Sequence, residues 1–483
     1  MKLWKKRVLA LVLTAACVLP GAACAVPEEN DNPVAPTATQ IPEQEKEQKK
    51  DMEEEKKENA EVSKVPLKTT ATQLTKAEYP EMAQYPKIDG FNYDEDAYEA
   101  WRTSRMAQQS ENKEYQNGIR EFYEATMQEF LKDTEGKNKI YSPLNVYMAL
   151  AMLAETAEGE SRQQILDLLH TDSIETLRNN ASILWNANYC DDGTVTSLLA
   201  SSAWLKEGLS YNQETLNTLA KYYYASSFRG TMGSAEYNKM LQDWLNEQTG
   251  GLLEEQASKI EMDPMTVFAL ATTVYFKAKW SSEFFEGNNT EEVFHAASGD
   301  MTTEFMHQSG TNTYYWGENF GAISRGLQNS GNMLLILPDE GIPVEDLLTD
   351  AEVLNFIYDQ YSWENQKRLI INQSIPKFDV VSDFSLISGL KNLGVTDVFS
   401  FKTADFTPLT TDRDVAVSGA THAARVLIDE EGCLAAAFTV MLMATSSAPP
   451  KDQMDFVLDR PFLFVINGQD NQPLFIGIVN QPK

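Results

Sequence analysis

The distribution of apolar and polar residues divides the chain into three parts. Val8–Pro20 is almost uniformly apolar, whereas residues 26 to about 74 are rich in Glu, Lys, Pro, Thr and Gln. From Tyr115 onward the apolar residues become periodic, as expected of a folded domain. Spacings of three and four residues predict helices over 115–131, 143–153, 161–169, 211–224 and 240–247, with Ser142 and Ser161 as N-caps.

Later in the chain, short apolar and β-branched runs replace the helical pattern. They predict strands at 200–206, 226–232, 267–276, 333–337, 369–378, 462–466 and 473–479. The run at 333–337 ends in the turn sequence Pro338-Asp339-Glu340-Gly341. Helices early and strands late predict an α+β domain over residues 116–483.

The N-terminus has the pattern of an export signal. Four basic residues between Lys2 and Arg7 precede the apolar run. Val8–Pro20 is short for a membrane-spanning helix, although a retained anchor is one alternative. We therefore expect residues 1–24 to be a signal peptide and the protein to work outside the cytoplasm.

Cys24 follows Gly21 and two alanines, a run of small residues that resembles a bacterial lipoprotein cleavage site. The match departs from the usual pattern at Gly21, where such sites carry Leu. It predicts a lipid on Cys24 that anchors the protein to the outer face of the cell membrane. Ordinary cleavage after Ala25, with free secretion, is the alternative.

Residues 25–77 are rich in Glu, Lys, Pro, Thr and Gln and nearly free of aromatics. Such a composition cannot bury enough apolar surface to offset the entropy lost on folding, so we predict an acidic disordered linker. Aromatic residues return between Glu78 and Trp101. We predict that residues 78–115 form an N-terminal extension that packs on the domain.

Charge and composition exclude several function classes. The chain has 483 residues, 71 acidic and 40 basic, and a net charge of −31, which argues against nucleic-acid binding. Four histidines, with no HExxH and no CxxC motif, predict no metal site and no cofactor. Two cysteines, Cys190 and Cys433, lie beyond the signal region, and we expect both to be free thiols.

The resemblance to a known family rests on motifs that follow in order from Asn138 to Pro482. The chain resembles the serpins, the serine protease inhibitor superfamily. The matching segments are NKIYSPLNVYMALAML (138–153), LNEQTGGLLEE (245–255), VFALATTVYFKAKW (267–280), LLILPDEG, IPKFDV, LKNLGVTDVFS, ADFTPLT, THAARVLIDEEGCLAAAFT, DRPFLFVI and PLFIGIVNQP.

The resemblance implies the serpin fold, in which helices pack around a large, mainly antiparallel central sheet and a reactive-centre loop is exposed. It also implies a trapping mechanism. A protease cuts the loop and forms an acyl-enzyme, after which the loop inserts as a new strand into a five-stranded sheet. The native state must then be a kinetic trap.

The resemblance assigns Ser142, Asn145, Thr272 and His422 to the shutter beneath the central sheet and Trp280 to the breach. In and beside the shutter, three residues depart from the family pattern. Thr272 replaces the usual Asn, Asn145 the usual Ser, and Ala423 the usual Lys. Because Thr and Asn still form hydrogen bonds, the shutter is expected to remain polar.

By the same resemblance, the hinge of the loop begins at Glu430. Alternate residues of an inserted strand point to opposite faces, so Cys433, Ala435, Ala437 and Thr439 would face inward, and all four are small. No proline or charged residue occurs from Cys433 to Ala448, so nothing blocks a hydrogen-bonded ladder. The hinge comprises Glu430, Glu431, Gly432, Cys433, Leu434, Ala435, Ala436 and Ala437.

Counting from Glu430 places the reactive bond at Ser446-Ser447, with Ala444-Thr445 and Thr445-Ser446 as alternatives. Every candidate is small and uncharged. A trypsin-like protease needs Lys or Arg at this position, and the first basic residue is Lys451. Elastase- or subtilisin-like proteases therefore fit best, and a shifted register at Leu442 or Met443 would suit a chymotrypsin-like protease.

The predicted function is suicide-substrate inhibition of extracellular serine proteases by a monomer that is not itself an enzyme. The protease is the expected partner, held as a covalent acyl-enzyme. One alternative is a non-inhibitory serpin that binds a partner or ligand, but such members usually carry bulky, charged or Pro residues in the hinge. Another is inhibition of cysteine proteases through the same loop.

Overall fold

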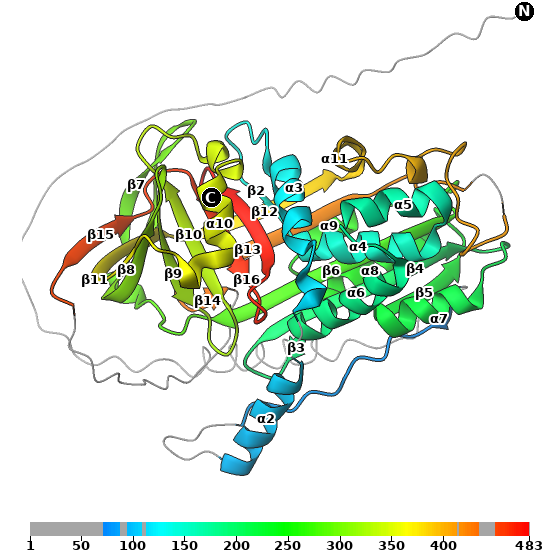
Figure 1. The fold of residues 1–483 in the computed structure, drawn as a ribbon, viewed down its shortest axis with the longest axis horizontal. Helices are drawn as coiled ribbons and strands as arrows, with labels where there is room; N and C mark the ends of the chain where they lie inside the picture. Colours follow the sequence, from blue (N-terminus) through cyan, green and yellow to red (C-terminus); the bar gives the residue numbers. More distant parts are fainter. Residues whose placement is uncertain (1–70, 87–93, 109–112, 413–414, 434–449, 483) are drawn as a thin grey trace, which may run out of the picture. The chain divides into compact units, whose positions relative to one another are not determined.

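The structure is a computed structural model, and it describes residues 71–86, 94–108, 113–412, 415–433 and 450–482. Within these residues the chain forms two large sheets with helices packed around them (Figure 1). The α+β architecture and the helices around a large, mainly antiparallel sheet confirm the predicted fold class.

The central sheet has eight strands in the described residues, in the order β1-β5-β4-β6-β14-β13-β12, with β3 beside β4. Only β4 and β5 pair in parallel. Five longer strands, β5, β4, β6, β13 and β12, are supplemented by three short ones. The bounds are β1 Thr72–Thr75, β3 Cys190–Asp191, β4 Thr196–Lys206, β5 Ala225–Gly230, β6 Phe268–Lys279, β12 Phe378–Ser385, β13 Thr421–Ile428 and β14 Gly432–Cys433.

The second sheet has nine strands in the described residues, in the order β15-β11-β8-β9-β10-β16-β17-β2, with β7 beside β8. Its central strands β10, β16 and β17 are buried along their whole length, and their sequences read as continuous apolar runs. The bounds are β2 Lys139–Tyr141, β7 Thr290–Ala296, β8 Gly299–Trp316, β9 Phe320–Gly326, β10 Asn332–Pro338, β11 Gln366–Pro376, β15 Gln453–Val457, β16 Phe462–Asn467 and β17 Pro473–Val479.

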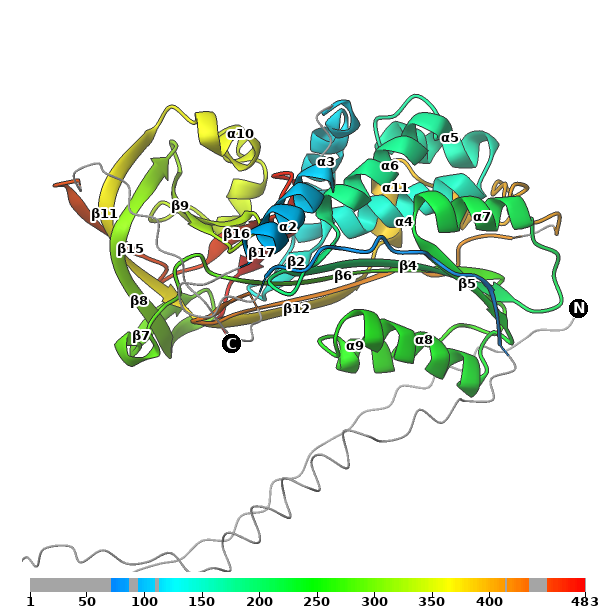
Figure 2. The same cartoon turned by 90° about the horizontal axis from the view of Figure 1, so that it is seen from below.

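The helices cover both faces of the central sheet. Figure 2 shows α4, α5, α6 and α7 on one face and α8 and α9 on the other. The bounds are α2 Glu95–Gln108, α3 Ile119–Leu131, α4 Pro143–Thr156, α5 Gly159–Leu168, α6 Ile174–Asn188, α7 Gln213–Tyr222, α8 Ala235–Gln248, α9 Glu254–Ser258, α10 Ala351–Asp359 and α11 Ile387–Asn392.

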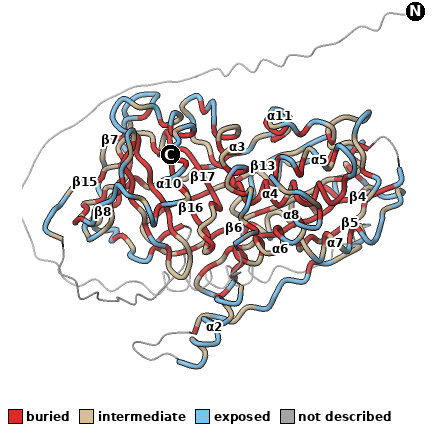
Figure 3. Tube along the Cα trace, in the orientation of Figure 1, coloured by how far each residue is buried: buried red, intermediate tan, exposed pale blue. Residues whose placement is uncertain are grey.

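Helix α4 is buried along almost its whole length (Figure 3). Thirteen of its residues are buried, which explains why its sequence is apolar on every side. Ser142 caps its N-terminus by accepting a hydrogen bond from the Asn145 N–H, and Pro143 occupies the first turn, as predicted.

Some predicted elements differ from the structure. Ser161 is not an N-cap, because α5 begins two residues earlier and the buried Ser161 hydroxyl instead accepts from the Asp405 N–H. Helix α6 was not predicted. The expected strand at 369–378 is two strands, divided at Lys377.

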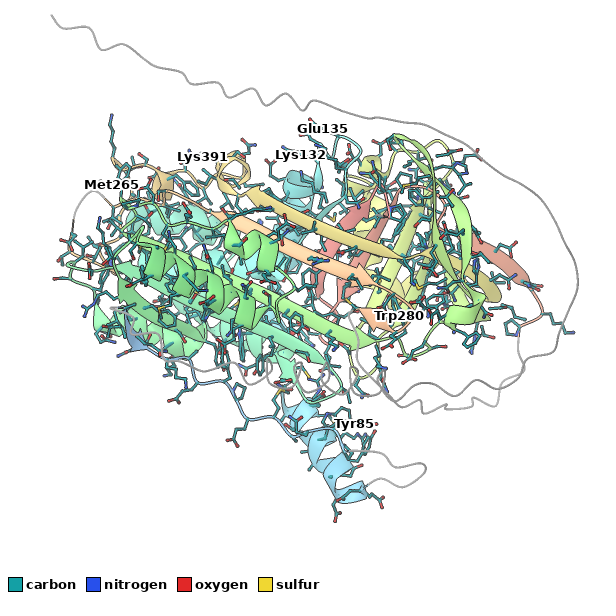
Figure 4. The ribbon with its side chains drawn as sticks, turned by 180° about the vertical axis from the view of Figure 1, so that it is seen from behind. Tyr85, Lys132, Glu135, Met265, Trp280 and Lys391 are labelled. Carbon is teal, nitrogen blue, oxygen red and sulfur yellow. The ribbon has the colours of Figure 1, made fainter. Side chains whose placement is uncertain are left out.

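The N-terminal segment joins the domain earlier than the predicted linker boundary at residue 77. Thr72–Thr75 forms strand β1, which pairs antiparallel with β5. Farther along, the Tyr79 ring stacks on Trp185 with ring centres 5.7 Å apart. In α2, Trp101 Nε1 donates to the Asp192 carboxylate at 2.8 Å. Figure 4 shows Tyr85 beside this helix.

Within the described ranges, no helix has the length and apolar character needed to cross a bilayer. The same residues contain no group of three His, Cys, Asp or Glu side chains arranged to hold a metal ion. Cys190 and Cys433 are both buried free thiols, in agreement with the prediction.

Candidate functional site

The candidate site lies between β6 and β13, a position that we call the seam. Strand β14 occupies one end of it. Gly432 pairs with Lys279 of β6, and Cys433 pairs with both Ala278 of β6 and Ile428 of β13. Among the described residues, no register joins β6 directly to β13. In the described part of the sheet, β6 and β13 are therefore joined only through the short strand β14.

Residues 429–433, which we call the loop stem, turn the chain from β13 into β14. The Asp429 carboxylate accepts from the backbone N–H groups of Glu431 and Gly432, at 3.0 and 3.1 Å. The Asp429 N–H donates to the Gly432 carbonyl. These three bonds form a tight turn that directs the chain back along β6 and into the seam.

Two ion pairs fasten the stem to the sheet. Glu430 Oε1 lies 2.7 Å from Lys377 Nζ and also accepts from Asn289. Glu431 lies 3.7 Å from Lys279, the last residue of β6. Lys377 is the residue between β11 and β12, so the Glu430 pair ties the stem to the point where the two sheets meet.

Gly432 and Cys433 fit the seam closely. Gly432 has φ 153°, and a Cβ there would lie 2.4 Å from the Ala278 carbonyl oxygen. Only glycine therefore fits beside β6. Cys433 is 3% exposed, and burial raises the pKa of its thiol to about 12. A small side chain at this position fills the interior beneath the seam.

The predicted shutter residues come together beneath the middle of the seam. Asn145 Nδ2, on α4, donates to the Thr272 carbonyl of β6 at 3.2 Å. The Ser142 N–H donates to His422 Nε2, on β13, at 3.0 Å. Helix α4 is thus hydrogen-bonded to the strand on each side of the seam.

His422 is held as a neutral acceptor. Burial lowers the pKa of its ring to about 4, and the hydrogen bond from Ser142 requires Nε2 to be unprotonated. The rings of Tyr141 and Phe384 pack near it, with centres at 6.4 and 5.6 Å. A proton on Nε2 would remove the bond between β13 and α4.

The outer face of the seam is covered by the connection between α8 and α9. Arg425 of β13 donates to the Leu252 carbonyl at 3.1 Å and pairs with Asp379 of β12. Tyr275 of β6 packs beneath Gly250. This connection therefore contacts both strands that border the seam, and a strand entering the seam must pass under it.

This arrangement of sheet, stem and shutter agrees with the comparisons. The sequence profile described as "Serpin (serine protease inhibitor)" matches residues 117–482. The chain is a serpin.

The serpin relatives span most of this chain. The sequence is 28% identical to "Uncharacterized serpin-like protein TK1782" of Thermococcus kodakarensis, over 73% of this chain and 83% of that protein. It is 27% identical to "Leukocyte elastase inhibitor A" of Mus musculus, over 71% and 93%. The native-state crystal structure of the thermophilic serpin tengpin superposes with a TM-score of 0.68 at 26% identity, covering 77% of this chain and 95% of tengpin.

Not every predicted site residue of this serpin can be placed. Trp280 lies at the end of β6, where its indole N–H donates to the Asp429 carbonyl at 2.9 Å (Figure 4). It therefore touches the stem and not the shutter. The predicted hinge residues Leu434, Ala435, Ala436 and Ala437, the reactive-bond candidates Ala444, Thr445, Ser446 and Ser447, and the lipidation site Cys24 lie outside the described residues.

Sequence reasoning missed several residues that position the stem. Asp429 stands out in the sequence only as the first residue of an Asp-Glu-Glu-Gly turn, and no local pattern marks Lys377. Arg325 is buried beside the Trp280 ring, 4.9 Å from its centre, and donates to Gln373 at 2.6 Å. Burial lowers the pKa of Arg325 to about 9. Its position depends on contacts across three strands that no local sequence window contains.

Proposed function

We propose that this serpin inhibits extracellular serine proteases by trapping them as covalent acyl-enzymes. Cleavage near Ser446-Ser447 would release the loop, which then enters the seam as a new strand. The observation that supports this most strongly is the pairing of Gly432 and Cys433 with β6 on one side, and of Cys433 with β13 on the other. If the loop inserts, these two residues would be the first of the new strand, and their pairing with both neighbouring strands supports the proposal.

The surroundings of the seam favour insertion of the residues that follow. If the ladder continues in the observed register, Ala435 would lie between Phe276 and Val426, and Thr439 between Thr272 and His422. The inward positions nearest the stem, from Cys433 to Thr439, are small, so they would fit above the buried α4. This is the composition expected of an inhibitory loop.

The target class follows from the uncharged reactive-bond candidates. Proteases with small or apolar primary pockets, of the elastase or subtilisin type, are the proposed partners. We further propose that the chain is exported, that Cys24 carries a lipid and that residues 26–70 connect this anchor to the domain. The proposed inhibitor acts as a monomer and catalyses no turnover of its own.

The test begins with residues 71–483, which retain β1. This protein is mixed with elastase, subtilisin, chymotrypsin and trypsin, and products are examined by denaturing gel and intact mass. We expect a denaturant-stable complex with elastase or subtilisin and a released peptide that begins at Ser447. Cleavage of the loop by all four proteases, with no covalent complex, would contradict the proposal and favour a non-inhibitory binding protein.

A further inference from the structure

The point at which the N-terminal segment enters the central sheet bears on how an anchored protein would trap a protease. Thr72 of β1 pairs with Arg229, and Arg229 pairs with Leu205. Leu205 in turn pairs with Phe268, the first residue of β6. These residues form one row across the sheet, at the end of β6 opposite to Lys279 and the stem.

The distance between this row and the stem follows from strand geometry. From Phe268 to Lys279 there are eleven residue steps, or about 36 Å. Strand β1 runs antiparallel to β5, so its chain enters at Thr72 from beyond the Phe268 row. In Figure 2 the blue N-terminal segment begins at the end of the central sheet that is farther from the second sheet.

The inserted loop would end at this same row. Gly432 opposite Lys279 and Cys433 opposite Ala278 place Met443 opposite Phe268 if the register continues. Ser446 would then lie three residues, or about 10 Å, beyond the row. Four strand spacings, about 19 Å, separate that position from β1 across the sheet.

We infer that residues 26–70 form a spacer whose length is required for trapping at a membrane surface, an inference that rests on the proposed function. Before cleavage the stem lies at the far end of the sheet from Thr72, so an anchored protein presents its loop away from the membrane. Insertion then carries the bound protease to the end where the anchor is attached. The protease must fit between that end and the bilayer.

The sizes are compatible with this requirement. A protease of about 230 residues has a radius of gyration of about 17 Å and hence a diameter of about 45 Å. Residues 25–70 comprise 46 residues; a flexible chain of this length has a root-mean-square span of about 37 Å, slightly below that diameter, and a fully extended reach of about 150 Å, well above it. A spacer of a few residues would leave no room.

The attachment at β1 is firm, so the spacer ends at residue 70 and does not extend farther along the chain. The Ala77 N–H donates to Ser226 of β5 at 3.1 Å, and the Tyr85 N–H donates to the Asp192 carbonyl at 2.8 Å. Arg105 of α2 is buried beside the Asp192 carboxylate and donates to the Asn329 carbonyl. These contacts prevent residues 72–86 and 94–108 from serving as additional spacer.

The test uses the chain from Ala25 onward with an N-terminal hexahistidine tag, bound to phosphatidylcholine vesicles that contain a nickel-chelating lipid. A second version lacks residues 26–69, which leaves at most about 11 Å of extended chain between tag and β1. A third replaces residues 26–69 with a Gly/Ser sequence of equal length. Each is mixed with whichever protease of the panel traps the soluble chain, on vesicles and in solution.

We expect all three versions to give equal covalent complex in solution. On vesicles the short version should still be cleaved at its outward-facing loop but give at least fivefold less covalent complex, and the Gly/Ser version should match the native spacer. Equal complex from the short and native spacers on vesicles would overturn the inference. If no version forms complex in solution, the proposed function itself is refuted and the inference with it.

Discussion

Replacing Gly432 with alanine should expel the loop stem from the central sheet. The added Cβ would lie 2.4 Å from the Ala278 carbonyl oxygen and 2.7 Å from the Lys279 Cα, both backbone atoms that cannot yield. The φ of 153° is also one that side chains with a Cβ rarely adopt. Strain of this kind costs about 3 kcal/mol, which shifts the equilibrium between docked and expelled stem about a hundredfold.

The Cys433 thiol reports this shift directly. In the docked stem it is buried, and its pKa of about 12 leaves over a thousandfold less thiolate than an ordinary cysteine, whose pKa is about 8.5. Alkylation at pH 8 therefore proceeds through the expelled state. We expect iodoacetamide to label Cys433 about a hundredfold faster in Gly432→Ala than in the wild type, measured by peptide mass spectrometry.

Two controls separate stem release from general unfolding. Cys190 is also buried, so its labelling rate should be the same in both proteins unless the whole domain opens. Gly310→Ala in β8 adds a Cβ with nothing within 4 Å and should leave the Cys433 rate unchanged. Wild-type labelling of Cys433 in Gly432→Ala would refute the close fit of β14 against β6.

Three further changes test the shutter and the stem. Below about pH 6.5 the His422 ring takes up a proton in the unfolded state but not in the folded state, where its pKa is about 4. The free energy of unfolding, measured in urea, should therefore fall by about 2.5 kcal/mol between pH 7 and pH 4.5. This decrease should be absent in His422→Gln. Equal losses in both proteins would contradict a neutral, buried ring. Asn145→Ala removes the donor to the Thr272 carbonyl and should lower the free energy of unfolding by about 1 kcal/mol. A synthetic peptide of the loop sequence should also enter the sheet of this variant faster, as followed on native gels. Unchanged peptide uptake would count against a shutter role. Glu430→Gln weakens the ion pair with Lys377 by at most about 1 kcal/mol, so the rate of Cys433 labelling should rise no more than about fivefold. A hundredfold rise would show that this ion pair, and not the packing of Gly432, holds the stem in the sheet.

Much of the fold could be predicted because its strongest signals are local. Helix α4 and strands β10, β16 and β17 are buried on all sides, so their sequences are continuous apolar runs with clear ends. The order of the family motifs then fixed the arrangement of these elements. The residues around Ser142 and His422 could be assigned in the same way, because each lies inside a recognisable motif.

Elements that depend on a partner strand escaped prediction. Strand β1 has the polar sequence Thr-Gln-Leu-Thr and becomes a strand only because β5 offers an open edge. Strand β8, 18 residues long, is largely polar because much of it is exposed. The contacts of Asp429 and Lys377 with the stem are likewise set by tertiary packing, and neither residue stands out in the sequence.

The central claim is that the stem is the start of a strand that completes itself once the loop is cut. Calorimetry of residues 71–483, intact and after a single cleavage in the loop, tests it without knowledge of the natural protease. The proposed insertion would add a strand that pairs with β6 and β13 over most of their length, so the cleaved protein should unfold at a clearly higher temperature than the intact one. An equal or lower unfolding temperature after cleavage would contradict the account.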